Sequence, residues 1–214
     1  MAGPLRLSDL ATAAGATRLQ KALGSTDEEA ARSLVYARKY LKDHPELYNL
    51  RIGLAPTSFF DHNSDRIGIA TSNPDILAHE LGHAADLGLD QGIYKNVITP
   101  RSKDLNSLID NSALIGATAM TAVTDSQVAS KYLNYATALA AASAAPTLYN
   151  EAVATHIAAS KSGNYLKTLS KLSPGLMSHT LNVLSPVAKL QAIKYIKDLP
   201  ADKRYIANSV MRSV

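Results

Sequence analysis

The feature that most constrains the fold is one helix that carries two histidines and a glutamate. Asn73 is a good N-cap residue and Pro74 suits the first helical position, so we expect a helix over residues 74–87. His79 and His83 lie four residues apart in this helix and therefore share one face. Histidines with this spacing can bind one Zn²⁺ ion, which needs a further ligand from elsewhere in the chain. The fold must therefore bring a distant segment to this helix.

The glutamate of the motif is Glu80, which lies between the histidines in the pattern HExxH. There it can act on a water molecule bound to the metal. Leu77, Leu81 and Ala84 form an apolar stripe on the opposite side of the helix, which we expect to face the core. The metal-binding and packing residues thus point in different directions.

The strand-like run Ile67-Gly68-Ile69-Ala70 and the HELGH motif at residues 79–83 together resemble a zincin metallopeptidase. In that family an edge strand precedes the active-site helix and aligns an extended substrate. The resemblance therefore implies an edge strand over residues 66–70, a Zn²⁺ cofactor and a protein or peptide substrate. Glu80 would be the catalytic base, which takes a proton from the zinc-activated water and passes it to the leaving amine.

Three positions are candidates for the third zinc ligand. A histidine six residues after His83 would indicate a metzincin, but position 89 is Leu. Asp86 shares a face with His83, yet it lies about 10 Å along the helix axis from His79, so we expect it to orient a ligand histidine instead. Glu151 lies among apolar residues, where a carboxylate needs a partner such as a metal. We therefore predict that His79, His83 and Glu151 bind the metal.

A ligand glutamate on a later helix resembles the gluzincins, and the layout is nearest to the HtpX and CAAX-protease type. In those proteins a hairpin of apolar helices separates HExxH from the glutamate. The corresponding charge-free segments here are residues 111–124 and 132–150, which are too short or too weakly apolar for a membrane span. Position 155 is Thr, where an acidic residue is often found in that family. These differences weigh against the membrane-protease branch and leave the metal site unaffected.

The remaining sequence predicts a mainly α fold with a small β-sheet, an α+β class. Short β-type runs occur at residues 51–54 and 66–70, on either side of a polar turn. One helix should end at Gly24, and the next should begin at a capping box of Ser25 and Glu28. The predicted helices outside the motif span residues 5–23, 25–42, 105–124, 128–145, 147–161, 174–184 and 186–198, and the last three begin near Pro146, Pro174 and Pro186.

Because no linker is evident, we expect one domain over residues 1–214. It would comprise a helical part at 1–47, the sheet and active-site helix at 48–90, and a second helical part at 91–214. A hydrophobic fraction of 46% fits a globular chain, and the absence of cysteine excludes disulfides, thiolate zinc sites and a cysteine nucleophile. No signal peptide is recognisable, which favours a cytoplasmic protein or one carried in a phage particle.

Several functional alternatives stay open beside a zinc endopeptidase. Short HExxH proteins of this kind are also encoded by phages, so the chain could be a catalytically silent zincin-like structural protein of a larger assembly. Its Ala-rich helices or its basic C-terminus, which carries the whole net charge of +4, would then contact partners. The spacing of Ala11 and Gly15 weakly suggests a helix-turn-helix, but we do not expect nucleic acid binding or a membrane span. The candidates for the oxyanion donor are Tyr149, His156, Tyr165 and His179.

Overall fold

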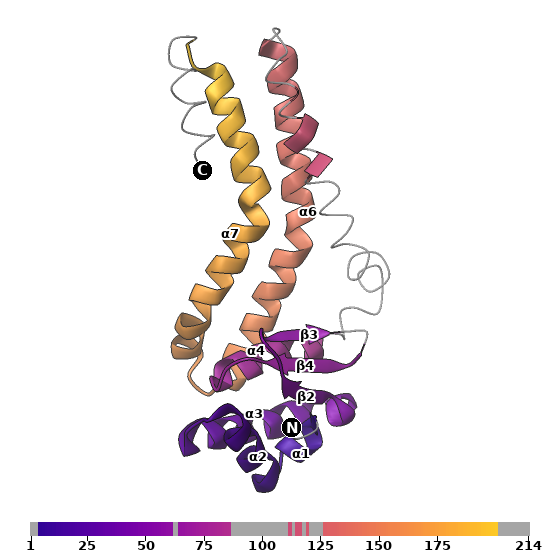
Figure 1. The fold of residues 1–214 in the computed structure, drawn as a ribbon, viewed down its shortest axis with the longest axis vertical. Coiled ribbons are helices and arrows are strands. Elements are labelled where there is room, and N and C mark those ends of the chain that lie inside the picture. The colour runs from indigo at the N-terminus through magenta and orange to yellow at the C-terminus, as the bar shows by residue number, and fades with distance from the viewer. Residues whose placement is uncertain are drawn as a thin grey trace. The chain divides into compact units, whose positions relative to one another are not determined.

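The computed structural model describes residues 4–61, 64–86, 111–112, 114–116, 119 and 126–200. It is mainly helical with a small mixed sheet, which confirms the predicted α+β class (Figure 1). The described elements are β1 (Leu5–Arg6), α1 (Leu7–Leu10), α2 (Ala13–Leu23), α3 (Asp27–Asp43), the 3₁₀ helix η1 (Pro45–Asn49), β2 (Arg51–Leu54), β3 (Phe59–Asp61), β4 (Arg66–Ile69), α4 (Pro74–Ala85), α6 (Ser126–Lys161) and α7 (Tyr165–Asp198).

The described residues form two compact units. The first contains those up to residue 86 together with 149–177, and the second contains those of 111–148 together with 178–200. α6 and α7 each contribute residues to both units. The single domain stays a prediction, and the helix predicted over residues 105–124 lies mostly outside the described residues. In the part of the chain that is described, no helix has the length and apolar character needed to cross a membrane.

The first unit is built on a four-stranded sheet with the order β1-β2-β4-β3. β2 and β4 are parallel, whereas β1 and β3 pair antiparallel with their neighbours. The two strands predicted from the sequence are thus confirmed, but the expectation that residues 66–70 form an edge strand is wrong. β4 lies between β2 and β3, and β3 is the edge. β3 has only three residues, Phe-Phe-Asp, so it has no alternation by which the sequence could reveal it.

The core of the first unit lies between one face of the sheet and helices α3 and α4. Its largest buried side chains include Ile52, Ile67, Ile69, Tyr40, Leu77 and Leu81. α3 buries Tyr36, Ala37 and Tyr40, whereas Val35 is 48% exposed. The tyrosines face inward because their hydroxyls find partners on α4, where the Tyr40 hydroxyl donates to the Ala78 carbonyl over 2.7 Å.

The N-terminal helices differ from the prediction at their starts. Residues 5–6 form strand β1, and a Thr12 N-cap separates α1 from α2. Gly24 ends α2 in the left-handed conformation, with φ 66°, as predicted. The capping box of α3 is formed by Thr26 and Glu29, one residue later than expected, because the Glu29 carboxylate accepts from the Thr26 backbone N–H at 2.8 Å.

The three prolines expected to begin new helices lie inside continuous ones. Pro146 is inside α6, and Pro174 and Pro186 are inside α7, so these predicted boundaries are wrong. A proline lacks the N–H that would bond the carbonyl four residues earlier. At Pro174 that carbonyl belongs to Ser170, and the Ser173 hydroxyl donates to it instead at 2.9 Å. This side-chain bond gives the Ser170 carbonyl a partner in place of the missing backbone N–H.

The second unit is held together by contacts between its parts of α6 and α7. Leu133, Ala136, Ala140 and Leu190 form its buried cluster. Polar side chains add two contacts beside it, in which Lys194 donates to Asn134 at 2.7 Å and Gln191 donates to Thr137 at 3.1 Å. The basic residues of the extreme C-terminus, Lys203, Arg204 and Arg212, lie outside the described residues.

Candidate metal centre

The two histidines of the motif lie on α4, which begins as the sequence predicts. The Asn73 side chain accepts from the Asp75 backbone N–H at 2.9 Å, and Pro74 occupies the first helical position. His79 and His83 therefore lie one turn apart, with ring centroids 4.7 Å from each other. Both side chains are largely buried, with exposed fractions of 14% and 18%.

Glu151 reaches this pair from α6, far along the chain. Its Oε2 atom lies 3.2 Å from His79 Nε2, and its Oε1 atom lies 3.6 Å from His83 Nε2. One ligand atom from each of the three residues falls within 4.8 Å of the others. The predicted ligand set is therefore brought together, and each residue offers an atom that Zn²⁺ accepts.

The spacing of these atoms fits a metal ion. Zinc binds nitrogen and oxygen at about 2.0–2.2 Å in a tetrahedral arrangement, which separates neighbouring ligand atoms by about 3.4 Å. The distances from Glu151 Oε2 to His79 Nε2 and from Glu151 Oε1 to His83 Nε2, 3.2 and 3.6 Å, lie on either side of that value. Two imidazole nitrogens and one carboxylate are also the protein ligands of catalytic zinc sites that keep a fourth position open.

Close backbone packing brings Glu151 within reach of the histidines. Gly82 of α4 lies against Ala154 of α6, and a Cβ built on Gly82 would be only 2.5 Å from the Ala154 carbonyl oxygen. Gly82 lies next to His83 in the sequence, and Ala154 follows Glu151 by three residues. The glycine thus permits the approach of the two helices at the level of the ligands.

Thr155 supports the site in a way that the sequence analysis missed. It lies four residues after Glu151, on the same face of α6, and is only 2% exposed. Its Oγ1 lies 3.2 Å from Nδ1 of His79. When Nε2 of a histidine binds a metal, Nδ1 carries the proton, so His79 would donate to Thr155. The available sequence signal was the helical spacing from Glu151.

Glu80 is buried beside the ligands, with an exposed fraction of 7%, and is not one of the clustered ligand residues. Burial raises the pKa of Glu80, and the neighbouring His83 and His79 partly oppose this shift. For His83, burial lowers the pKa, but the carboxylates of Glu151, Glu80 and Asp86 together raise it above its ordinary value. The glutamate and the histidines therefore form one electrostatically coupled group.

The other candidate residues lie around the site in different ways. Asp86 is the C-cap residue of α4 and acts electrostatically on His83 without joining the ligand cluster. Tyr149 is 49% exposed. The His156 ring lies 3.1 Å from the Tyr165 hydroxyl, so the rings of His156 and Tyr165 contact each other on the exposed side of α6. The side chain of His179 lies outside what the structure describes.

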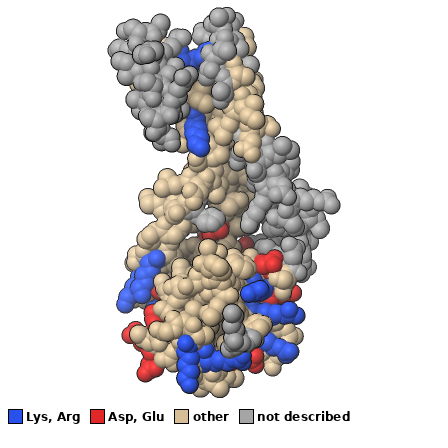
Figure 2. Space-filling model, in the orientation of Figure 1, with Lys and Arg blue, Asp and Glu red and all other residues tan. Residues whose placement is uncertain are grey.

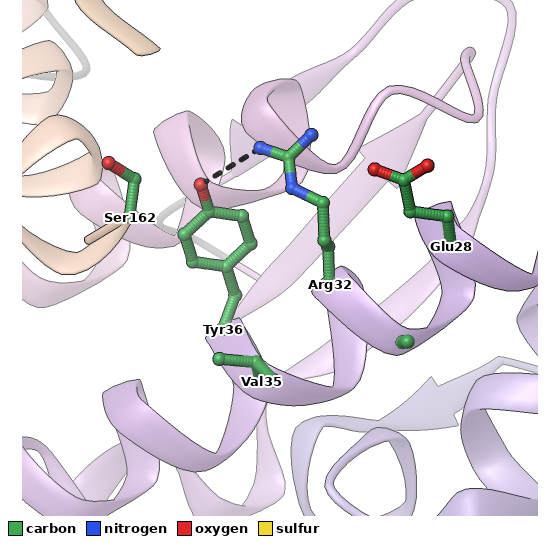
Figure 3. Close-up of a pocket in the computed structure, with 6 residues that line it drawn as sticks. Glu28, Arg32, Val35, Tyr36 and Ser162 are labelled. Atoms are coloured by element: carbon green, nitrogen blue, oxygen red, sulfur yellow. Dashed lines mark hydrogen bonds between the residues drawn. The ribbon is translucent and has the colours of Figure 1, made fainter. Parts of the chain in front are cut away.

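A separate polar cluster holds the start of α4 in place. The buried Asp75 carboxylate forms an ion pair with Arg32 and accepts from the Tyr36 hydroxyl at 2.8 Å, and Lys171 Nζ lies 3.5 Å from its Oδ2. A pocket next to this cluster contains none of the candidate metal ligands (Figure 3). Its lining consists of Glu28, Ala31, Arg32, Val35, Tyr36 and Ser162. The cluster anchors α4 to α3 and to the nearby part of α7.

Comparison with known proteins identifies no relative. No protein-family model, curated protein or solved structure matches the chain. The geometry and chemistry of the site are therefore the basis for its function.

Proposed function

We propose that the protein is a zinc-dependent metallopeptidase of the zincin type, which hydrolyses peptide bonds. His79, His83 and Glu151 would hold the ion, and Glu80 would act as the general base. The observation that carries this proposal is the convergence of Glu151 on both histidines, at 3.2 and 3.6 Å, in a chain whose motif spacing independently indicates a zinc site. The same geometry supports a gluzincin-like ligand set.

The chain's own residues suit this reaction. Three protein ligands leave a position for water, and bound zinc would supply Lewis acidity toward that water and the peptide carbonyl. Glu80 is a buried carboxylate next to the ligands, where it can accept the proton of the attacking water and deliver it to the leaving amine. Asp86 and Thr155 would orient the two ligand histidines.

The sheet supports a protein or peptide as the substrate. An extended peptide can add to an exposed sheet edge by main-chain hydrogen bonds. β3 is the edge next to β4, and it packs against α4, the helix that carries the motif. We therefore assign the alignment of the substrate to β3, in place of residues 66–70.

Cleavage of an unfolded protein such as casein by the zinc-loaded chain tests the proposal. Glu80→Gln should keep its zinc and lose at least about a hundredfold in rate, because the base is gone while the ligands stay. Glu28→Gln, an equivalent change at an exposed glutamate of α3, should cleave like the unmodified protein. Zinc binding without any cleavage, across a panel of unfolded proteins and peptides, would favour the catalytically silent structural protein instead.

A further inference from the structure

Strands β2 and β4 carry the same short pattern, Arg-Ile-Gly followed by an aliphatic residue. They are parallel and in register, so that Arg51 lies opposite Arg66, and Gly53 lies opposite Gly68. On the other side of β2, strand β1 places Arg6 opposite Arg51. Three arginines therefore form a row across three adjacent strands.

This row lies on the outer face of the sheet. Ile52 and Ile67, the next residues along β2 and β4, are buried at 1% and 0% exposure, so the alternating arginines point the other way. Arg6, Arg51 and Arg66 are all exposed, and none of them forms an ion pair with another described residue. Neighbouring strands are about 4.8 Å apart, so the row spans about 10 Å. Like charges directly opposite one another destabilise a sheet.

The conformation of Arg66 increases this concentration of charge. Asp61 of β3 lies opposite Arg66 in the register, and its carboxylate accepts from the Ser64 hydroxyl at 2.6 Å. The Arg66 guanidinium extends instead over Gly53, where a Cβ would lie 3.6 Å from its Nη2. Arg66 therefore reaches toward β2, the strand of Arg51, and away from the carboxylate on β3.

An aromatic ring completes this face. The Phe59 ring covers Gly68, since a Cβ there would be 2.4 Å from the ring, and Phe59 remains 36% exposed. Gly53 of β2 and Gly68 of β4 add no side chains of their own to this face of the sheet. Figure 2 shows basic side chains, with acidic ones among them, in the lower part of the view. We call the surface formed by Arg6, Arg51, Arg66 and Phe59 the arginine face.

We propose that the arginine face docks an acidic segment of a partner protein. Guanidinium groups bind carboxylates in a bidentate manner, which lysine cannot do. Acidic residues at alternate positions of an extended peptide are about 7 Å apart, so two of them fit within the 10 Å row, and Phe59 can contact an apolar residue between them. The described residues of the first unit carry equal numbers of basic and acidic side chains. The row is short and the charges of the unit balance, which favours a short acidic motif over nucleic acid, whose usual footprint is a basic patch or stripe on a domain of high pI.

Fluorescence anisotropy with a labelled peptide tests this proposal. The probe is a nine-residue peptide with Glu at alternate positions and Leu at its centre, and its partner probe has Gln in place of every Glu. The protein is the full chain carrying Glu80→Gln, so that the proposed peptidase cannot consume the probe. The Glu peptide should bind saturably and more weakly as salt rises. The double variant R51Q/R66Q should bind it at least tenfold more weakly.

The control is the double variant R18Q/K21Q, which removes the same charge from exposed positions of α2. It should bind the Glu peptide within twofold of the parent. The proposal fails if the Gln peptide binds as well as the Glu peptide, if neither peptide binds, or if the two double variants behave alike. A twenty-residue oligothymidylate that binds more tightly than the peptide through Arg51 and Arg66 would also overturn it, in favour of nucleic acid. Because no zinc is involved, failure here leaves the metallopeptidase proposal standing.

Discussion

Gly82 of α4 lies directly against the backbone of Ala154 in α6, which leaves no room for a side chain on the glycine. A Cβ on Gly82 would lie 2.5 Å from the Ala154 carbonyl oxygen and 3.0 Å from its Cα. The contact is between backbones, so no flexible side chain can move aside to relieve it. Since Glu151 precedes Ala154 by almost one turn, this approach sets how near its carboxylate comes to the histidines.

Gly82→Ala should therefore force the two helices apart. We expect the free energy of unfolding to fall by about 1–3 kcal/mol, as for overpacking elsewhere, and zinc to bind more weakly. Urea unfolding of the zinc-free protein and competition with a chelating dye measure the two effects separately. Gly175→Ala is the matched control, because Gly175 lies in α7 with open space around it, and it should stabilise the protein by about 0.5–1 kcal/mol. Equal behaviour of both variants would contradict the role of the close contact.

Thr155→Val should weaken zinc binding by about 10- to 100-fold while keeping the shape of the buried side chain. The reason is that a valine methyl group cannot accept the hydrogen bond that the protonated Nδ1 of His79 donates when Nε2 binds a metal. Thr155→Ser, which keeps the hydroxyl, should bind zinc nearly as the unmodified protein does. Competition titrations measure the affinities, and the ¹⁵N chemical shifts of His79 report which nitrogen is protonated. Unchanged zinc affinity in the valine variant would show that Thr155 does not support the metal site.

The ion pair between Asp43 and Lys161 predicts a pH dependence of stability. Lys161 Nζ lies 2.5 Å from Asp43 Oδ2, and its hydrogen bond and charge hold the pKa of Asp43 below its ordinary value of 3.8. A carboxyl group with a lowered pKa stabilises the fold above its unfolded pKa, and this contribution is lost as the pH falls through the folded value. Asp43→Asn should therefore reduce the thermal midpoint at pH 7 and make no difference well below pH 3.8. A difference that is independent of pH would show that the charge of Asp43 is not responsible.

Arg51→Glu should stabilise the protein, although it changes an exposed residue of a central strand. The variant replaces two like-charge pairs, with Arg6 and Arg66, by two opposite-charge pairs in the same register. Cross-strand charge pairs contribute roughly 0.2–1 kcal/mol, so a gain of about 1 kcal/mol is expected in urea unfolding at low salt, and a smaller gain at high salt. A loss of stability would show that repulsion between the arginines does not destabilise the sheet. Arg18→Glu, on α2, serves as the reference for a surface charge reversal.

Much of the candidate metal site could be predicted because its signals are local. The Asn73 cap, Pro74 and the histidine spacing define α4 within a few residues, and all of these features are read from adjacent positions. Glu151 could be proposed by elimination, since the chain has few glutamates and this one is surrounded by apolar residues. The roles of Gly82 and Thr155 depend on how α4 crosses α6, which no local pattern encodes.

The sheet illustrates what the sequence could not reveal. β1 and β3 have two and three residues, too few for a periodic pattern, so their positions emerge only from pairing with β2 and β4. The arginine row is hidden for the same reason, because its members are far apart in sequence and meet through register alone. The prolines had the opposite effect, because they predicted helix boundaries where the helices continue. Proline is a strong local signal for a helix boundary, but Ser173 supplies the bond that Pro174 removes.

The zinc content of the purified protein, measured by mass spectrometry, tests the central claim most directly. The unmodified chain should carry about one zinc ion per molecule, and Glu151→Ala should lose it because two histidines alone leave too few protein ligands. Asp86→Ala and Glu80→Gln should keep it, since neither residue belongs to the ligand cluster. Absence of zinc from the unmodified protein, even after refolding with the metal, or full retention of zinc by Glu151→Ala, would contradict the account.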